Sequence, residues 1–257
     1  NFMKKELSIL NKENEKIFIE TYTPSNIKST IVFCHGITGC RKGRTLNDDY
    51  FQKLAIKLMN ENYKVVLFDF SGHGNSEGND YVTLSKSTRE LAKVIGQENI
   101  NLDNINFLAF SYGATVLSNY ISKNNIIPNH VVLYSPCLYP LESCFLNSKS
   151  IFGKDIVKAN QDGSLKEKGY AIVGAKNFRF SGKMLNECQE FNSDYLKGIS
   201  NKILCLSGTQ DVILDTTYND EFCQKNNITN IYLNASHSLY EEIETAFKYT
   251  IDFFNKE

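Results

Sequence analysis

The sequence contains no tryptophan, only four histidines and four prolines, and no excess of charge of either sign. Its 28 basic residues are balanced by 29 acidic residues, which gives a formal net charge of −1. Without a strong field of one sign, neither nucleic acid nor a membrane surface is favoured as the main partner. The sequence also lacks an apolar run near the ~18–20 residues that span a bilayer. We therefore expect a small-molecule partner, no nucleic acid and no membrane span.

The seven cysteines show no CxxC spacing and are odd in number. They match neither a zinc site nor a disulfide framework, so no metal is expected. Cys34 and Cys205 lie inside apolar runs, where buried free thiols are the usual finding. The N-terminal residues show no apolar stretch typical of a signal peptide. These features together favour a reducing, cytoplasmic compartment.

Short apolar runs alternate with longer segments of helical periodicity. The runs are typical of strands covered on both faces and lie at 30–34, 65–70, 105–110, 131–134, 203–206 and 231–233. The helical segments lie at 49–60, 84–95, 114–121, 216–225 and 240–254, and an N-terminal hairpin is expected at 6–10 and 16–22. This alternation predicts an α/β fold with a mainly parallel sheet of about eight strands and helices on both faces.

Residues 138–198 interrupt the alternation. No strand pattern is evident there, and aromatic residues are spread among polar ones. Because an unstructured loop of about 60 residues is uncommon in a compact domain, we predict a partly helical cap. The cap would be inserted between two parts of one core, residues 1–137 and 199–257. Phe178 and Phe180 are candidates for binding substrate from the cap; the alternative is that they form its own core.

An apolar run ends at residue 110 in the segment Ala-Phe-Ser-Tyr-Gly (109–113), directly before a predicted helix. A nucleophile elbow needs this strand–turn–helix context, because large side chains two positions either side of the serine would collide. Ala109 and Gly113 are small enough to relieve that crowding. The pattern indicates that Ser111 is a nucleophile; the alternative is an ordinary cap of the helix N-terminus.

Two glycine-rich loops follow neighbouring buried runs, His-Gly-Ile-Thr-Gly at 35–39 and Ser-Gly-His-Gly-Asn-Ser at 71–76. Glycines in the first loop allow the backbone to turn close to a reacting carbonyl. The N–H of Ile37 and the N–H of Tyr112, at the positive end of the following helix, would then form an oxyanion hole.

Three motifs, His-Gly-x-x-Gly, Asp-x-x-Gly-x-Gly-x-Ser and small-x-Ser-x-Gly, occur in this order and together resemble the α/β-hydrolase superfamily. The chain looks most similar to bacterial esterases of the monoacylglycerol lipase and cinnamoyl (feruloyl) esterase type. The resemblance extends from about residue 31 to residue 254 and is weakest in the predicted cap. It implies a serine hydrolase whose triad runs in the order serine, acid, histidine.

The implied acid follows a late strand, where Asp211 ends a Gly-x-x-Asp segment and Asp215 is the alternative. Of the four histidines, only His130 and His237 follow Ser111. His130 precedes a buried run and should lie at the far edge of the sheet. His237 follows the last run, at the carboxyl edge where open α/β sheets bind their ligands, so it is the expected base.

Other polar residues of the glycine-rich loops have two interpretations each. His35 and His73 are expected to position the backbone rather than to transfer protons. Arg41, Lys42 and Arg44 follow the first loop, where they would form a solvated surface. Alternatively they would face an anionic leaving group, such as that of a coenzyme A or carrier-protein thioester.

The implied mechanism begins when His237 accepts the proton of Ser111, while Asp211 orients the imidazole. Attack on an ester carbonyl gives an oxyanion and then an acyl-enzyme, which water hydrolyses. This chemistry requires no metal and no organic cofactor. The predicted substrates are carboxylic esters with small or medium acyl or aromatic groups. The alternatives are an acyl-thioesterase or acyltransferase, a serine peptidase, and a non-catalytic binding module on the same fold.

Overall fold

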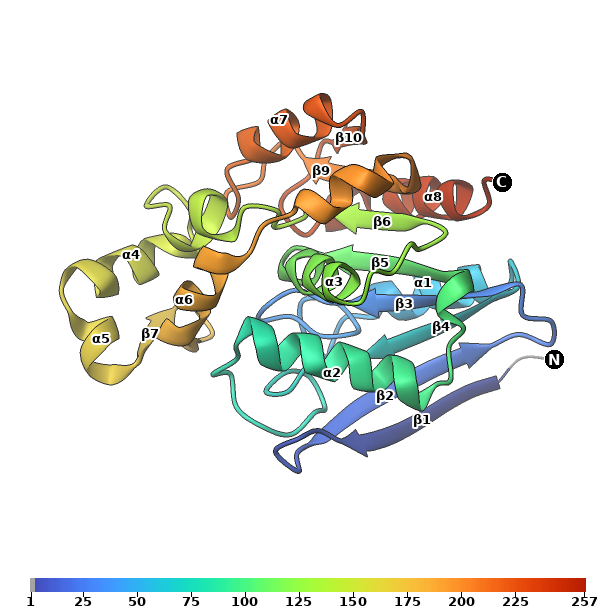
Figure 1. The fold of residues 1–257 in the computed structure, drawn as a ribbon, viewed down its shortest axis with the longest axis horizontal. Coiled ribbons are helices and arrows are strands. Elements are labelled where there is room, and N and C mark those ends of the chain that lie inside the picture. Colours follow the sequence, from blue (N-terminus) through green and yellow to red (C-terminus); the bar gives the residue numbers. More distant parts are fainter. Residues whose placement is uncertain (1–2) are drawn as a thin grey trace.

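The computed structural model describes residues 3–257, which form a sheet of eight strands in the order β1-β2-β4-β3-β5-β6-β9-β10 (Figure 1). β1 pairs antiparallel with β2, and β2 with β4, whereas all other neighbours are parallel. This arrangement confirms the predicted mainly parallel sheet and its N-terminal hairpin. The strand bounds are Met3–Leu10 (β1), Lys16–Thr23 (β2), Ser29–Cys34 (β3), Tyr63–Phe68 (β4), Ile105–Phe110 (β5), Val131–Tyr134 (β6), Ile203–Gly208 (β9) and Thr229–Leu233 (β10).

Helices cover both faces of this sheet and create two apolar cores. Successive residues of a strand point to opposite faces, so Val32 packs into one core and Phe33 into the other. This is why the central strands read as continuous apolar runs. The first core also contains residues of α2 (Leu84–Gln97), α3 (Tyr112–Lys123) and α7 (Thr217–Lys225), and the second those of α1 (Tyr50–Met59) and α8 (Ile243–Phe254).

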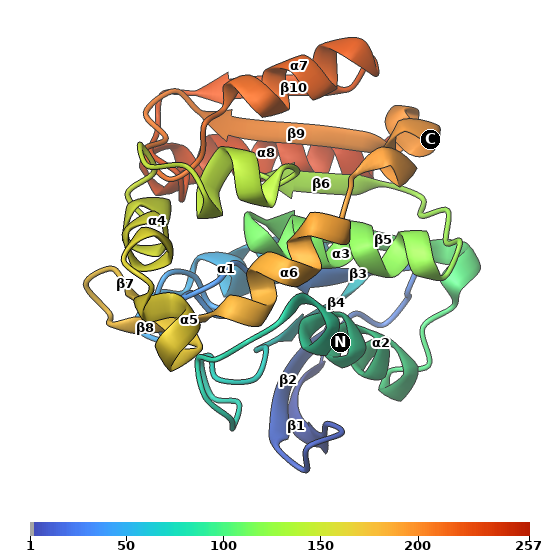
Figure 2. The same cartoon turned by 60° about the vertical axis from the view of Figure 1, so that its left-hand side comes forward.

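The part of the chain between β6 and β9 that runs from residue 141 to residue 190 lies beyond the carboxyl ends of the parallel strands (Figures 1 and 2). It contains a short antiparallel hairpin, β7 with β8, where the sequence predicted no strand. Each strand has only four residues and pairs with no strand of the main sheet, so its period was too short to recognise. The elements are η2 (Leu141–Phe145), α4 (Gly153–Gln161), α5 (Ser164–Lys168), β7 (Tyr170–Val173), β8 (Phe178–Ser181) and α6 (Gly182–Glu190).

Three short helices complete the chain, η1 (Leu102–Asn104), η3 (Asp194–Lys202) and η4 (Tyr240–Glu242). Because η4 directly precedes α8, the predicted helix at 240–254 is divided into these two elements. Among residues 3–257, no helix combines the length and the hydropathy needed to cross a bilayer.

Candidate active site

Ser111 occupies a sharp turn between β5 and α3. Its backbone has φ 52° and ψ −117°, a conformation that costs a residue with a side chain about 1–3 kcal/mol. The turn is held by two hydrogen bonds, from Ser111 N–H to the Tyr134 carbonyl (2.9 Å) and from Cys137 N–H to the Ser111 carbonyl (3.0 Å). A Cβ atom at Gly113 would lie 2.0 Å from the carbonyl oxygen of Cys34. Glycine is therefore required there for helix α3 to approach β3.

The structure brings Ser111, His237 and Asp211 into one hydrogen-bonded chain. His237 Nε2 lies 2.9 Å from Ser111 Oγ, and His237 Nδ1 lies 2.7 Å from Asp211 Oδ2. An ionised carboxylate can only accept, so Nδ1–H donates and Nε2 keeps a lone pair for the serine hydroxyl proton. Ser135 fixes the far side of the loop by donating its hydroxyl to the His237 carbonyl at 2.7 Å.

Both carboxylate oxygens of Asp211 accept hydrogen bonds. Oδ2 faces His237, and Oδ1 accepts the N–H groups of Ile213 (2.8 Å) and Leu214 (2.9 Å). Burial alone would raise the pKa of this carboxyl, but the electrostatic attraction and hydrogen bond of His237, with the two N–H donors, outweigh it and lower the pKa. Asp211 thus stays ionised at neutral pH. The alternative acid, Asp215, instead accepts the N–H of Thr217 at 3.1 Å at the start of α7.

The loop after β3 leaves one N–H group free beside Ser111. Thr38 N–H donates to His73 Nε2 (3.0 Å) and Gly39 N–H donates to the Gly36 carbonyl (3.2 Å). Within residues 3–257 the N–H groups of Ile37 and Tyr112 make no such bond, and both residues line the same cavity as Ser111. Tyr112 is the first residue of α3, where helical N–H groups have no intrahelical partner. The two donors proposed from the sequence are therefore available.

Two buried histidines tie this loop to the loop after β4. His35 Nε2 accepts the N–H of Phe70 (3.0 Å), while its Nδ1 lies 2.7 Å from the Gly36 carbonyl, to which it donates. His73 accepts from Thr38 and donates from Nδ1 to the Ser71 carbonyl at 3.0 Å. Burial lowers the pKa of both imidazoles and keeps them neutral. These contacts are of the positioning kind expected from the sequence.

Neither sequence interpretation holds for Arg41, which is buried in an ion cluster. Its Nε lies 2.7 Å from Glu20 Oε2 and its Nη1 lies 2.6 Å from Asp69 Oδ2. Asp69 also accepts the N–H of Asn75 at 2.9 Å. Arg41 is therefore neither solvated nor available to a ligand; it joins the loops after β3 and β4. Lys42 remains at the surface, where its ammonium donates to the carbonyl of Leu46 at 2.7 Å.

A cavity of about 350 Å³ opens above Ser111 and His237. The aromatic residues that line it from the 138–198 segment are Phe145 and Phe152. Phe178 and Phe180, which the sequence proposed for substrate binding, do not reach the cavity. They are only 5% and 1% exposed and pack behind those two rings, with Phe180 at 4.7 Å from Phe145 between ring centroids. This corrects the choice of aromatic residues in favour of the alternative that Phe178 and Phe180 form a core.

Three residues that line the cavity, Phe145, Phe152 and Lys176, were not among those proposed from the sequence. Phe145 had one usable signal, since it follows the strand β6 closely and neighbouring strand ends meet at one edge of the sheet. Lys176 lies in the turn between β7 and β8, a hairpin that the sequence did not reveal.

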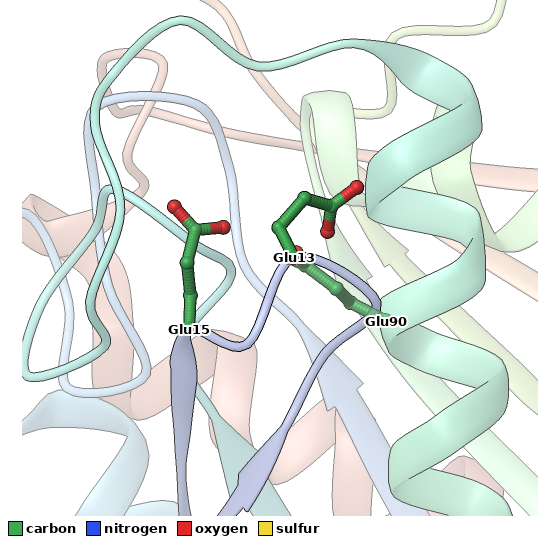
Figure 3. A group of neighbouring side chains, drawn as sticks. All are labelled: Glu13, Glu15 and Glu90. Carbon is green, nitrogen blue, oxygen red and sulfur yellow. The ribbon is translucent and has the colours of Figure 1, made fainter.

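Three carboxylates gather at a different place, where the β1–β2 turn meets α2 (Figure 3). One oxygen from each of Glu13, Glu15 and Glu90 lies within 4.8 Å of the others. Two of them already pair with cations, Glu15 with Lys86 at 2.7 Å and Glu13 with Arg89 at 3.3 Å. None of the three lines the cavity above Ser111. We assign this cluster no metal-binding role.

His130 lies immediately before β6, at the amino edge of the sheet, and packs against the ring of Phe253 at 5.1 Å. Burial and the nearby charges of Lys202 and Lys256 lower its pKa. This position, at the edge opposite Ser111, is the one expected from the sequence. His130 has no contact with the hydrogen-bonded chain of the candidate site.

Comparison with known proteins agrees with this architecture. The family model described as "alpha/beta hydrolase fold" matches residues 29–149. A putative hydrolase from Agrobacterium vitis S4 has a TM-score of 0.75 at 14% identity, with 98% of this chain and 99% of that chain covered. Est1E from Butyrivibrio proteoclasticus, solved with ferulic acid bound, has a TM-score of 0.71 at 14% identity, with coverage of 96% and 97%.

An esterase from Pyrococcus furiosus has a TM-score of 0.68 at 20% identity, with 98% of this chain and 91% of that chain covered. No curated protein sequence matches the chain. The protein has the α/β-hydrolase fold. The family match over residues 29–149 and the structural neighbours agree with this fold.

Proposed function

We propose that this protein is a serine hydrolase that cleaves carboxylic esters through an acyl-enzyme on Ser111. The observation that carries the proposal is the hydrogen-bonded chain from Ser111 Oγ through His237 to Asp211, at the floor of a cavity. His237 accepts the serine proton as Oγ attacks the carbonyl carbon, and it returns that proton to the leaving group. Asp211 stabilises the imidazolium that forms between these two steps.

The N–H groups of Ile37 and Tyr112 receive the oxyanion of the tetrahedral intermediate. Each such donor is worth about 2.7–4 kcal/mol in acyl transfer. Water then enters, His237 removes its proton, and attack on the acyl-enzyme releases the acid and restores Ser111. Every step uses groups of this chain, so the proposal includes neither a metal nor a cofactor.

Esters are the proposed substrates for two reasons: the cavity wall is largely apolar, and the descriptions of two structural neighbours point to ester chemistry. One is described as an esterase, and the other was solved with ferulic acid. The segment at 138–198 contributes Phe145, Phe152 and Lys176 to this wall, and we propose that it acts as the cap. All seven cysteines are free and buried, which fits the cytoplasmic location expected from the sequence.

The direct test is Ser111→Ala assayed with p-nitrophenyl esters and with a fluorophosphonate label. We expect kcat to fall by at least about 10⁴-fold, and labelling to disappear, because the residual rate comes only from binding and the oxyanion hole. Ser122→Ala is the matched control, since this exposed serine lies on the same helix. A Ser111→Ala protein that melts normally and still turns over near the wild-type rate would exclude the proposal.

A further inference from the structure

The lining of the cavity above Ser111 has two chemically different parts, which we call the apolar end and the mouth. The mouth carries two exposed cations, Arg44 and Lys176. No carboxylate of residues 3–257 lines the cavity. The apolar end is formed by Cys137, Cys144, Phe145, Phe152, Val212 and Ile213.

Lys176 reaches the mouth from the turn between β7 and β8. Its ammonium donates to the carbonyl oxygens of Thr38 and Arg44, both at 2.7 Å. Both partners are neutral, and no ion pair of the described chain includes Lys176. Loss of hydration lowers the pKa of Lys176; Cys40 and Asp48 act in the opposite direction, and the charge of Arg44 adds a smaller lowering. The ammonium has a third N–H group to offer and makes no direct ion pair, and the nearby carboxylate of Asp48 does not line the cavity.

Arg44 is fixed beside it by a ring and a carboxylate. Its guanidinium lies 4.1 Å from the centroid of the Tyr240 ring, and its Nε lies 3.4 Å from Asp48 Oδ2. Asp48, and more weakly Glu241, offset the charge of Arg44, but neither carboxylate lines the cavity. The mouth therefore presents guanidinium and ammonium donors toward the same space, and an anion there would receive hydrogen bonds from both.

We infer that the Arg44–Lys176 end is an anion subsite, and that the preferred esters carry a carboxylate or phosphate on the leaving group. The inference rests on the proposed function and specifies its substrate class. The acyl chain occupies the apolar end, because it stays covalently attached while the leaving group departs. The leaving group lies at the mouth, from which it can reach solvent without passing the acyl-enzyme.

Both cations are exposed, so solvent limits the effect. For a group that accepts from two charged donors at such a site, we expect a preference of about 10-fold. The test uses three butanoate esters on the full chain: 3-(butanoyloxy)benzoate, 3-(butanoyloxy)phenyl phosphate and the neutral methyl 3-(butanoyloxy)benzoate. Rates are divided by those of hydroxide-catalysed hydrolysis to remove differences in intrinsic reactivity. At least one anionic ester should exceed the neutral one about 10-fold in kcat/KM, and 0.5 M salt should reduce this preference.

Single substitutions test which residues cause the preference for anionic esters. Lys176→Met and Arg44→Gln should each lower the ratio of anionic to neutral kcat/KM several-fold. Lys42→Met removes a neighbouring cation outside the cavity and should leave that ratio unchanged. Melting curves verify that each variant is folded. If Lys176→Met lowers both rates equally, Lys176 only holds the cap against the core, and the subsite is refuted.

The subsite and the proposed function fail in different ways. Hydrolysis of all three esters without a preference for an anion would overturn the subsite and leave the esterase intact. If none is hydrolysed, the esterase proposal fails, and calorimetric titration of Ser111→Ala with the same compounds still tests the subsite. Binding of an anionic ester about 10-fold tighter than the neutral ester would support the anion subsite, and equal binding would overturn it.

Discussion

The loops around Ser111 and the 138–198 segment are built on different principles. In the loops, hydrogen bonds fix the direction of each group. Two backbone N–H groups donate to the Asp211 carboxylate, and the Ser135 hydroxyl donates to the His237 carbonyl. In the segment, rings such as Phe145 and Phe180 fill space without a defined polar geometry. Directional bonds provide the sub-ångström alignment that chemistry requires, whereas packed rings set the shape and size of a cavity.

Polar contacts join the segment to the rest of the chain at several places. Lys176 donates to the carbonyls of Thr38 and Arg44. The N–H of Asp215 donates to the Ser143 carbonyl at 2.8 Å. Other links join exposed side chains. Arg179 pairs with Asp80 at 2.9 Å, and Glu187 accepts the hydroxyl of Ser85 at 2.9 Å. Exposed pairs of this kind contribute about 0–1 kcal/mol each. The buried rings of the segment add apolar packing to these contacts. If the comparison is correct, substitutions in the loops should affect kcat, and those in the segment should affect stability or substrate choice.

The largest expected effect tests the directional bonds. Asp211→Asn should lower kcat for p-nitrophenyl esters by about 10³–10⁴-fold, because an amide can hold the wrong tautomer of His237. Asp215→Asn is the matched control, four residues away, and should cost less than about 10-fold. Steady-state kinetics with both variants measures the two losses. Equal losses, or the reverse order, would show that the acid has been assigned to the wrong carboxylate.

Phe180→Ala tests the packing of the segment. The ring is 1% exposed, so truncation should destabilise the fold by about 3–5 kcal/mol. Urea denaturation measures the loss, and Phe152→Ala, at a half-buried ring, should cost less. A stable Phe180→Ala variant with altered ester selectivity would instead restore this ring as a substrate contact.

Because His35 and His73 are buried, we expect the stability of the fold to depend on pH. His35 and His73 have a lowered pKa in the fold but titrate near 6.5 when unfolded. Below pH 6.5 the two histidines bind protons in the unfolded chain but not in the folded one. The free energy of unfolding is therefore highest above pH 6.5 and falls as the pH is lowered below it. The slope is about 1.4 kcal/mol per pH unit for each histidine, or about 2.7 for both. His130, which is more exposed, adds a smaller slope of the same sign.

Urea denaturation between pH 7.5 and 5 measures this slope. His73→Asn removes one titrating group and should reduce the slope by about half. An unfolding free energy that is flat over this range would show that the imidazoles are not buried and neutral as described.

The sheet could be predicted from the sequence because its signals are local. A continuous apolar run such as that of β5 identifies a strand buried on both faces, and the small residues around Ser111 mark the turn after it. The proximity of Asp211 and His237 followed from their places after the carboxyl ends of neighbouring strands. Sheet topology thus converts order along the chain into position in space.

The segment at 138–198 could not be predicted in the same way. Its hairpin strands have four residues each, and which ring faces the cavity depends on long-range packing. Phe178 and Phe152 are both aromatic residues of a segment without a clear strand or helix pattern, yet only Phe152 lines the cavity. Arg41 was misinterpreted for a related reason, since its partners Glu20 and Asp69 are distant in sequence.

The smallest expected effect is that of Phe152→Ala, which tests whether the segment sets substrate choice and not the chemistry. This ring belongs to the segment but lines the cavity. Removing it should widen the apolar end of the cavity and remove contacts with an acyl chain long enough to reach it. Each methylene that loses burial costs about 0.8 kcal/mol, so the loss of about two methylene contacts should lower kcat/KM for p-nitrophenyl octanoate about 10-fold. The acetate ester does not reach the ring, and its kcat/KM should change less than about 3-fold. Equal losses on acetate and octanoate would mean that the segment contributes to the chemistry itself, and the division between directional loops and space-filling cap would have to be abandoned.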